Sequence, residues 1–175
     1  MTPPNIKAKR INLVPFTEKH LSENYVGWLN NPTVVKYSEL RHITHSLETV
    51  THYYRCMCNS HHYFWAIELN TPKSTHIGNI TVVRDINNQL ADVSILIGDL
   101  AFQSQGYGLE SWRAACSYLL EYDGIRKVRA GTMAINIPMR RLMEKSDMIP
   151  DGIWRNHLLF EGNEVDVVFA ALFRI

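Results

Sequence analysis

The chain changes its periodicity at a loop that contains two glycines, and this change constrains the fold more than any other feature. Residues 90–97 alternate as in a strand, and from residue 107 onward the apolar residues recur at helical spacing. The loop between them includes Gln103, Ser104, Gln105, Gly106, Tyr107 and Gly108. The glycines allow the backbone to approach a ligand, and a helix start offers unpaired N–H groups to a pyrophosphate. On spacing alone, an ordinary glycine turn into a helix is the favoured interpretation.

The other periodicities predict an α+β chain built around one mixed sheet. The predicted strands are 11–14, 63–69, 76–84, 90–97, 127–132, 154–160 and 165–174. The predicted helices are one capped by Thr17, 47–58 capped by Ser46, one that begins at Tyr107 and one that follows Asn136. Strands 63–97 form an antiparallel meander, and the last two form a hairpin. No repeat or linker divides the sequence, so we expect one domain over residues 1–175.

Composition excludes several classes of protein. An apolar content of 46% and a charged content of 20% are typical of a globular chain of 175 residues with a sizeable core. A formal net charge of +1 gives no broad footprint for nucleic acid or an anionic membrane, so neither is expected as a partner. The chain has no apolar run of ~20 residues and no apolar leader. These features and three cysteines favour a cytoplasmic protein.

Three residues of the glycine loop carry a resemblance to a known family. Gln103, Gly106 and Gly108 match the pattern Gln/Arg-x-x-Gly-x-Gly/Ala, and in this the chain resembles the GNAT superfamily of acyl-CoA-dependent acetyltransferases. Further matches lie at 28–32, 91–99, 136–145, Arg155, His157, Gly162 and Asp166. These outer matches are similar to the branch that contains ribosomal-protein N-terminal acetyltransferases and sugar-modifying acetyltransferases.

The resemblance implies a three-layer α/β fold with a mostly antiparallel central sheet flanked by helices. The fourth and fifth strands of that fold, here 90–97 and 127–132, splay apart. Acetyl-CoA is the implied co-substrate, with its pyrophosphate on the loop and its thioester and pantetheine arm along the end of strand 90–97. The implied cofactor-binding residues are Leu96, Ile97, Gln103, Ser104, Gln105, Gly106, Tyr107, Gly108 and Asn136. A helix cap is an equally good explanation of Asn136.

Acetyl transfer to an amine requires a base that removes a proton from the amine. Asp92 matches an acidic position of the family's fourth strand and is the first candidate, although a solvated strand carboxylate explains it equally well. His42 and His45, in the loop before helix 47–58, are the other candidates, because a neutral imidazole is a base near physiological pH. An exposed linker is the favoured explanation of either histidine alone. In the same loop, Glu39 and Arg41 are the implied acceptor contacts, and Arg41 pairs with a carboxylate or phosphate of the acceptor or with Glu39.

Met143 stands where many relatives have a tyrosine that acts as general acid. Because methionine cannot donate a proton, the thiolate would leave with help from water, from Ser146 or from another element. The leading hypothesis is direct transfer of an acetyl group in a ternary complex to a primary amine of a protein N-terminus, an amino sugar or another small metabolite. A hydroxyl acceptor is a weaker option. The alternative from another class is a catalytically silent CoA-binding module, and a homodimer is left open.

One group of residues has the side chains of metal ligands, namely His52, Cys56, Cys58, His61 and His62. On a helix Cys58 points away from His52 and Cys56, and Cys-x-Cys is not the usual zinc spacing, so no metal is expected. The large aromatic residues expected in the core are Trp112, Trp154, Phe160 and Phe169.

Overall fold

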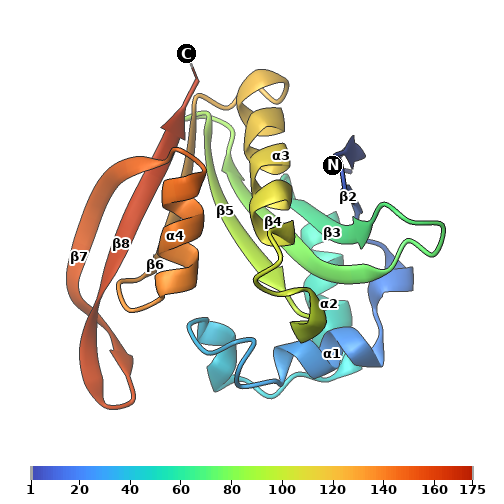
Figure 1. Ribbon diagram of the computed structural model, residues 1–175, viewed down its shortest axis with the longest axis horizontal. Helices are drawn as coiled ribbons and strands as arrows, with labels where there is room; N and C mark the ends of the chain where they lie inside the picture. Colours follow the sequence, from blue (N-terminus) through green and yellow to red (C-terminus); the bar gives the residue numbers. More distant parts are fainter. Residues whose placement is uncertain (1, 175) are drawn as a thin grey trace.

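A computed structural model describes residues 2–174, in which an eight-stranded sheet lies between two layers of helices (Figure 1). The strands are β1 (Ile6–Lys7), β2 (Ile11–Pro15), β3 (Tyr63–Leu69), β4 (His76–Asp85), β5 (Leu90–Ile97), β6 (Lys127–Met133), β7 (Ile149–Phe160) and β8 (Asn163–Phe173). The α-helices are α1 (Glu23–Leu29), α2 (Leu47–Cys58), α3 (Tyr107–Glu121) and α4 (Ile137–Lys145). Short 3-10 helices are η1 (Glu18–His20), η2 (Glu39–His42) and η3 (Leu100–Phe102). This architecture confirms the predicted fold class.

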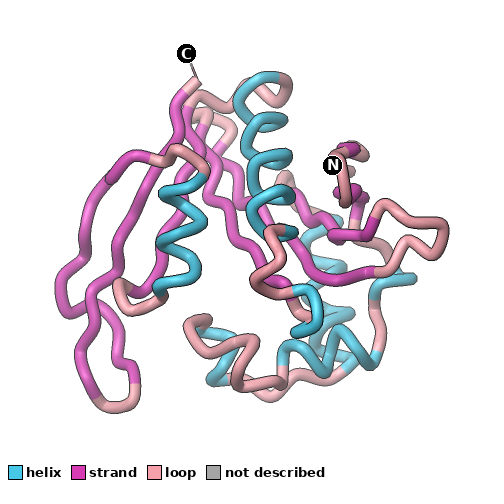
Figure 2. The backbone as a smooth tube through the Cα atoms, viewed as in Figure 1, coloured by secondary structure: helices cyan, strands magenta, loops and turns pink. Residues whose placement is uncertain are grey.

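The order of strands across the sheet is β1-β2-β3-β4-β5-β6-β8-β7. Figure 2 shows the strands in magenta and the helices in cyan. Every neighbouring pair is antiparallel except β5 and β6, which are parallel. A parallel pair requires a crossover connection, and here α3 supplies it. The glycine loop therefore lies at the start of the crossover, where β5 ends and α3 begins.

β5 and β6 are paired over a short stretch only. Their register begins at Leu90 opposite Lys127 and ends at Asp92 opposite Arg129, although β5 continues to Ile97. β6 remains paired with β8 on its other side as far as Met133 opposite Val167. The sheet thus splays between its two halves, as predicted, and the second half of β5 is not paired with β6.

Two apolar clusters fill the space on the two faces of the sheet. One contains Trp112 and Leu119 of α3, both buried, together with inward side chains of the central strands. The other contains Val26 and Leu29 of α1 and side chains of α2, and Leu96 of β5 packs against it. Because side chains alternate along a strand, β5 presents Leu96 to the second cluster and its neighbours Ile95 and Ile97 to the first. The end of β5 is therefore in contact with both layers.

Most predicted elements agree with the structure, and the differences lie near the ends of the chain. The helix expected after Thr17 is instead η1 followed by α1, since Ser22 provides a second cap by accepting a hydrogen bond from the N–H of Tyr25. β7 begins at Ile149 rather than at Trp154. None of the described helices is both long and apolar enough to cross a membrane.

The expectation that Trp154 belongs to the core was wrong. Its side chain is 51% exposed, whereas Trp112 is fully buried as predicted. Phe160 and Phe169 are only partly buried. The reason is the position of β7 at the edge of the sheet, beyond the strands whose side chains form the two described apolar clusters.

Candidate active site

The glycine loop forms an open N-terminus for α3. Gly106 is the N-cap residue and has φ of +83°, a left-handed conformation that glycine adopts without strain. Among the described residues, no side chain caps this helix. The first N–H groups of α3 are therefore left without helical partners at the positive end of the helix dipole, an arrangement suited to a phosphate group.

Gln103 connects the loop to the end of β5. Its side-chain amide donates a hydrogen bond of 2.8 Å to the carbonyl oxygen of Ile97. A methyl group on Gly108 would lie 3.5 Å from Ile97 and 3.7 Å from Leu142, which is ordinary van der Waals contact. Position 108 thus tolerates alanine, whereas Gly106 requires glycine for its backbone conformation.

Arg10, which no pattern in the sequence singles out, lies against this loop. Its backbone N–H and its Nε donate to the carboxylate of Glu110 at 2.6 and 2.7 Å, and its Nη1 donates to the carbonyl oxygen of Gln105 at 3.0 Å. The guanidinium carbon is 4.4 Å from the ring centre of Tyr107. A Cβ built on Gly106 would lie 3.3 Å from Nη2 of Arg10. A fixed positive charge therefore adjoins the open start of α3.

The carboxylate of Glu110 keeps Arg10 in place. Partial burial favours the neutral acid, but the hydrogen bonds and the charge of Arg10 outweigh it, and the pKa of Glu110 is lowered. The two residues are 100 positions apart in sequence, so no local pattern connected them.

Asp92 lies at the last pair of β5 and β6 before the strands separate. Its oxygens accept hydrogen bonds from Nε and Nη2 of Arg129 at 2.7 and 3.0 Å. Both side chains are partly exposed, 46% for Asp92 and 41% for Arg129. The predicted base is thus an accessible carboxylate with a fixed orientation, and it has a cationic partner that the sequence did not reveal.

The polar side chains at the two ends of α4, Asn136 and Ser146, form hydrogen bonds with the backbone of that helix. Asn136 accepts from the N–H of Met139 at 3.3 Å and donates to Thr132 at 2.9 Å, so it is a helix cap. Met143 is buried in the apolar cluster under α3. The buried hydroxyl of Ser146 lies 2.9 Å from two carbonyl oxygens of its own helix, at Leu142 and Met143. Neither Met143 nor Ser146 offers a free proton to a leaving thiolate.

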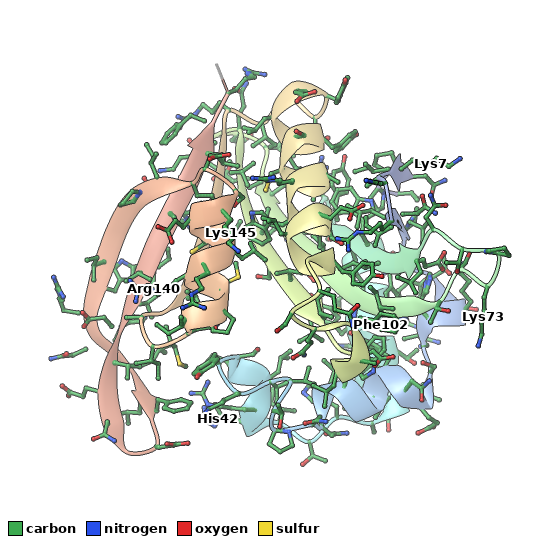
Figure 3. All side chains as sticks on the ribbon, viewed as in Figure 1. Lys7, His42, Lys73, Phe102, Arg140 and Lys145 are labelled. Carbon is green, nitrogen blue, oxygen red and sulfur yellow. The ribbon has the colours of Figure 1, made fainter. Side chains whose placement is uncertain are left out.

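The two histidines before α2 occupy different environments. The backbone N–H and carbonyl of His45 are both bonded to the side chain of Asn30, at 2.8 and 2.9 Å, and its ring Nε2 lies 3.3 Å from the carbonyl oxygen of Leu40. The side chain of His42, labelled in Figure 3, is 60% exposed. Its Nε2 lies 3.7 Å from the carboxylate of Glu39. His45 therefore fixes the shape of the loop, and His42 is open to solvent.

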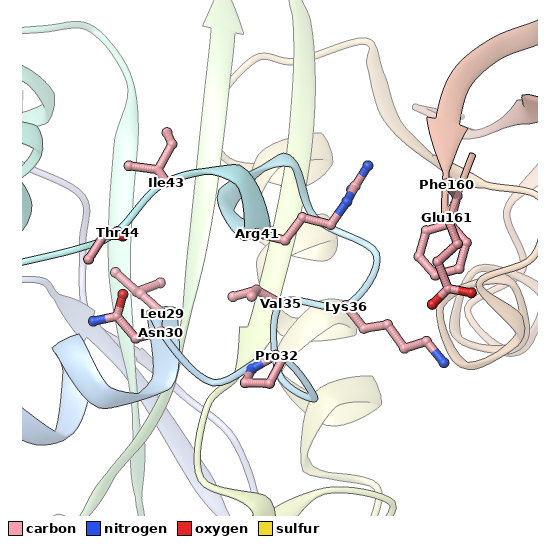
Figure 4. Close-up of a pocket in the computed structure, with 10 residues that line it drawn as sticks. All are labelled: Leu29, Asn30, Pro32, Val35, Lys36, Arg41, Ile43, Thr44, Phe160 and Glu161. Atoms are coloured by element: carbon pink, nitrogen blue, oxygen red, sulfur yellow. The ribbon is translucent and has the colours of Figure 1, made fainter. Parts of the chain in front are cut away.

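A cavity of about 380 Å³ lies between this loop and the turn of the β7–β8 hairpin (Figure 4). Its lining residues are Leu29, Asn30, Pro32, Val35, Lys36, Arg41, Ile43, Thr44, Phe160 and Glu161. Arg41 connects the two sides, because its Nη2 donates to the carbonyl oxygen of Leu159 at 3.1 Å. Its Nη1 donates to Glu39 at 2.8 Å, which is one of the two alternatives expected for Arg41.

The candidate metal ligands on α2 do not form a cluster. Sγ of Cys56 lies 3.6 Å from Nε2 of His52 on the exposed side of the helix. Among residues 2–174, no group of three or more such side chains is placed to hold a metal ion.

The comparison with protein families decides what this combination of loop, splayed strands and helices represents. The family model described as an acetyltransferase (GNAT) domain matches residues 10–149. The chain belongs to the GNAT acetyltransferases. A search of curated proteins finds no match to the sequence.

Solved structures of GNAT acetyltransferases share the fold over nearly the whole chain. A GNAT-family acetyltransferase from Bacillus anthracis is 18% identical with a TM-score of 0.84, covering 98% of this chain and 99% of its own. Spermidine N-acetyltransferase from Vibrio cholerae, in complex with CoA and spermine, is 15% identical with a TM-score of 0.83, covering 94% and 96%. A structure described as that of a ribosomal-protein-serine acetyltransferase from Vibrio cholerae is 18% identical with a TM-score of 0.75, covering 99% of both chains.

At these identities the likeness establishes the fold and not a shared acceptor. Membership of the GNAT family confirms the predicted resemblance and makes acyl-CoA-dependent acetyl transfer the activity of the family to which this chain belongs.

Proposed function

We propose that this GNAT protein transfers an acetyl group from acetyl-CoA directly to a primary amine in a ternary complex. The observation that carries the proposal is the end of β5, which pairs with β4 but not with β6, next to the uncapped start of α3. In this proposal the pyrophosphate binds the N–H groups of residues 105–108, flanked by the charge of Arg10. The pantetheine arm and thioester then lie along Leu96 and Ile97, between the splayed strands. Gln103, Ser104, Tyr107 and Asn136 complete the proposed cofactor site, with Gln103 holding the loop against β5.

In the proposed reaction, the amine nitrogen attacks the thioester carbon and the C–S bond breaks. Backbone N–H groups of β5 stabilise the negative charge on the carbonyl oxygen. The amine loses one proton, and the thiolate takes one up. No cysteine nucleophile is needed, because the amine itself attacks.

Asp92 is the proposed proton acceptor, acting through water. Leu96 is four residues further along β5, a distance of about 13 Å in an extended strand. Direct contact between the carboxylate and an amine at the thioester is therefore not expected. The bonds from Arg129 fix the direction of the carboxylate but leave it accessible. His42 is the alternative acceptor, because its ring is exposed. His45 is less favoured because it is less exposed and its Nε2 lies against the carbonyl oxygen of Leu40, which leaves Nδ1 as the acceptor.

Water is the proposed proton donor to the thiolate. Met143 has no proton to give, and the hydroxyl of Ser146 is directed to carbonyl oxygens of α4. A CoA thiolate is a good leaving group at neutral pH, so an acid from the protein is not essential.

The proposal is tested by incubating the protein with acetyl-CoA and a panel of amines and measuring released thiol. We expect release with at least one primary amine, and a product whose mass increases by one acetyl group. Calorimetry with CoA serves as the independent measurement of cofactor binding. Tight CoA binding without thiol release from any amine would instead identify the protein as a silent CoA-binding module.

A further inference from the structure

The cavity between η2 and the β7–β8 turn contains two positively charged side chains, Lys36 and Arg41. Leu29 lines this cavity and also belongs to the cluster against which Leu96 packs. The cavity and the end of β5 therefore adjoin the same apolar cluster. We propose that the acceptor carries an anionic group, a carboxylate or a phosphate, which Lys36 and Arg41 bind in this cavity. This inference rests on the proposed acetyl transfer and names the class of its acceptor.

Arg41 is held rigidly and still has donors to offer. Three of its N–H groups donate to the carbonyl oxygen of Ser38, to Glu39 and to the carbonyl oxygen of Leu159, at 2.9, 2.8 and 3.1 Å. Its Nε–H and one Nη2–H donate to no described residue. Only 16% of the side chain is exposed, so little conformational entropy is lost when an anion binds. A guanidinium held in this way is suited to the planar or tetrahedral oxygens of a carboxylate or phosphate.

Lys36 is the second cation and forms no ion pair with any described residue. Its Nζ lies 5.4 Å from the ring centre of Tyr37 and 6.0 Å from that of Phe160, and these two rings stack at 5.6 Å. The guanidinium of Arg41 is 5.8 Å from the same Phe160 ring. Both cations thus border one aromatic wall of the cavity (Figure 4).

Two carboxylates lie near these cations, and only one of them lines the cavity. Glu161 is the acidic residue of its described lining, and it is not within ion-pair distance of Lys36. Glu39, outside the lining, forms an ion pair with Arg41 and offsets part of its charge, but it accepts from Nη1 alone and leaves the Nε–H and one Nη2–H of Arg41 for an acceptor. The lining therefore has two cations against one carboxylate, which favours an anionic acceptor and disfavours a polyamine.

The test compares acceptors that differ only in the anionic group. Phosphoethanolamine is matched with ethanolamine, and β-alanine with β-alaninamide, while spermidine is the polycation. We expect kcat/KM, corrected for the fraction of free amine, to be at least about tenfold higher for the anionic member of one pair. A preference within the phosphoethanolamine pair would indicate a phosphate on the acceptor, and a preference within the β-alanine pair would indicate a carboxylate. Equal values within both pairs, or a preference for spermidine, would overturn the inference and leave acetyl transfer intact.

Substitution of the cations assigns the preference to this cavity. Lys36→Gln, at an exposed position, is expected to raise KM for the anionic acceptor about tenfold while KM for acetyl-CoA and for the neutral acceptor stays unchanged. Arg41→Lys keeps the charge but loses the fork of donors and is expected to have a similar effect. Lys73→Gln is the matched control, because Lys73 is an exposed lysine on the far side of the molecule (Figure 3). An unchanged KM in both cavity variants would contradict the assignment.

Binding can be measured without turnover. If no thiol is released, calorimetry can compare the affinity of the protein–CoA complex for the anionic and the neutral member of each acceptor pair. A difference in affinity that Lys36→Gln removes would support the anion site even where the proposed transfer fails. No difference would overturn the site.

Discussion

The carboxylate of Asp92 and the guanidinium of Arg129 form a two-point ion pair at the last residues that join β5 to β6. The distances are 2.7 and 3.0 Å, and beyond this pair the strands have no further common register. The ion pair thus marks the apex of the gap between the strands. Because both side chains are more than a third exposed, its contribution to the free energy of unfolding is expected to be below about 1 kcal/mol.

Asp92→Asn tests the proposed base. The amide retains the size of the side chain but cannot accept a proton, so we expect kcat at neutral pH to fall about 100-fold with KM for acetyl-CoA unchanged. Activity should partly recover at high pH, where solvent deprotonates the amine. Arg129→Gln is the comparison, and we expect it to lower kcat by much less. An equal decrease of kcat in the two variants would show that the ion pair has only a structural role and that Asp92 is not the base.

Gly106→Asp tests the phosphate site. The new carboxylate would lie next to Arg10 and occupy the place proposed for the pyrophosphate, so affinity for CoA should fall more than about tenfold. Gly124→Asp is the matched control, since Gly124 also has positive φ, at +73°, but follows the opposite end of α3 and has no neighbour within 4 Å of its added Cβ. Calorimetry should show normal CoA binding for this control. Unchanged affinity in folded Gly106→Asp would refute the assignment.

Arg10→Gln tests the residue that only the tertiary structure revealed. Loss of the positive charge beside the loop is expected to weaken CoA binding about three- to tenfold, with a smaller difference at high salt because exposed charges are screened. Lys9→Gln removes the neighbouring exposed cation, which has no ion pair among the described residues, and should leave the affinity unchanged. A titration of both variants at low and high salt makes the comparison. Identical behaviour of the two variants would remove Arg10 from the site.

The stability of the protein should fall as the pH is lowered from neutral. Burial lowers the pKa of His76 to about 4 from 6.5, despite hydrogen bonds to Asn79 and Gly78 that favour its charged form. Below pH 6.5 the histidine of the unfolded chain binds a proton, whereas that of the folded protein stays neutral. The contribution of His76 to the free energy of unfolding is therefore complete above pH 6.5 and is lost as the pH falls toward 4. The loss between pH 7 and pH 5 is expected to be about 2 kcal/mol. The neighbouring His20, whose pKa burial also lowers, acts in the same direction.

Urea unfolding at several pH values measures this effect. His76→Gln should have a flatter dependence between pH 7 and pH 5 than the unmodified chain. His42→Gln, at an exposed histidine, should retain the original slope. If His76→Gln also retains it, another group must account for the pH dependence.

Local patterns in the sequence were sufficient for much of the fold. The helix 47–58 and the strands 63–69 and 90–97 have the predicted bounds, because each is fixed by a cap, a turn or a period that lies within its own segment. Ser46, for example, accepts a hydrogen bond from the N–H of Thr49 three residues later. The exposed Trp154 was not predictable in this way, since its burial depends on which strand lies at the edge of the sheet.

The sequence alone determined the glycine loop, the change of period around it and the resemblance to the GNAT family. Only the tertiary structure decided which charged groups surround those elements. Arg10 meets Glu110 across 100 residues, Arg129 meets Asp92 across 37, and Arg41 meets Leu159 across 118. The loop can be predicted from the sequence because its backbone conformation depends on the residues within it, such as Gly106 with its positive φ. The charges are brought together by sheet order and helix packing, to which residues throughout the chain contribute.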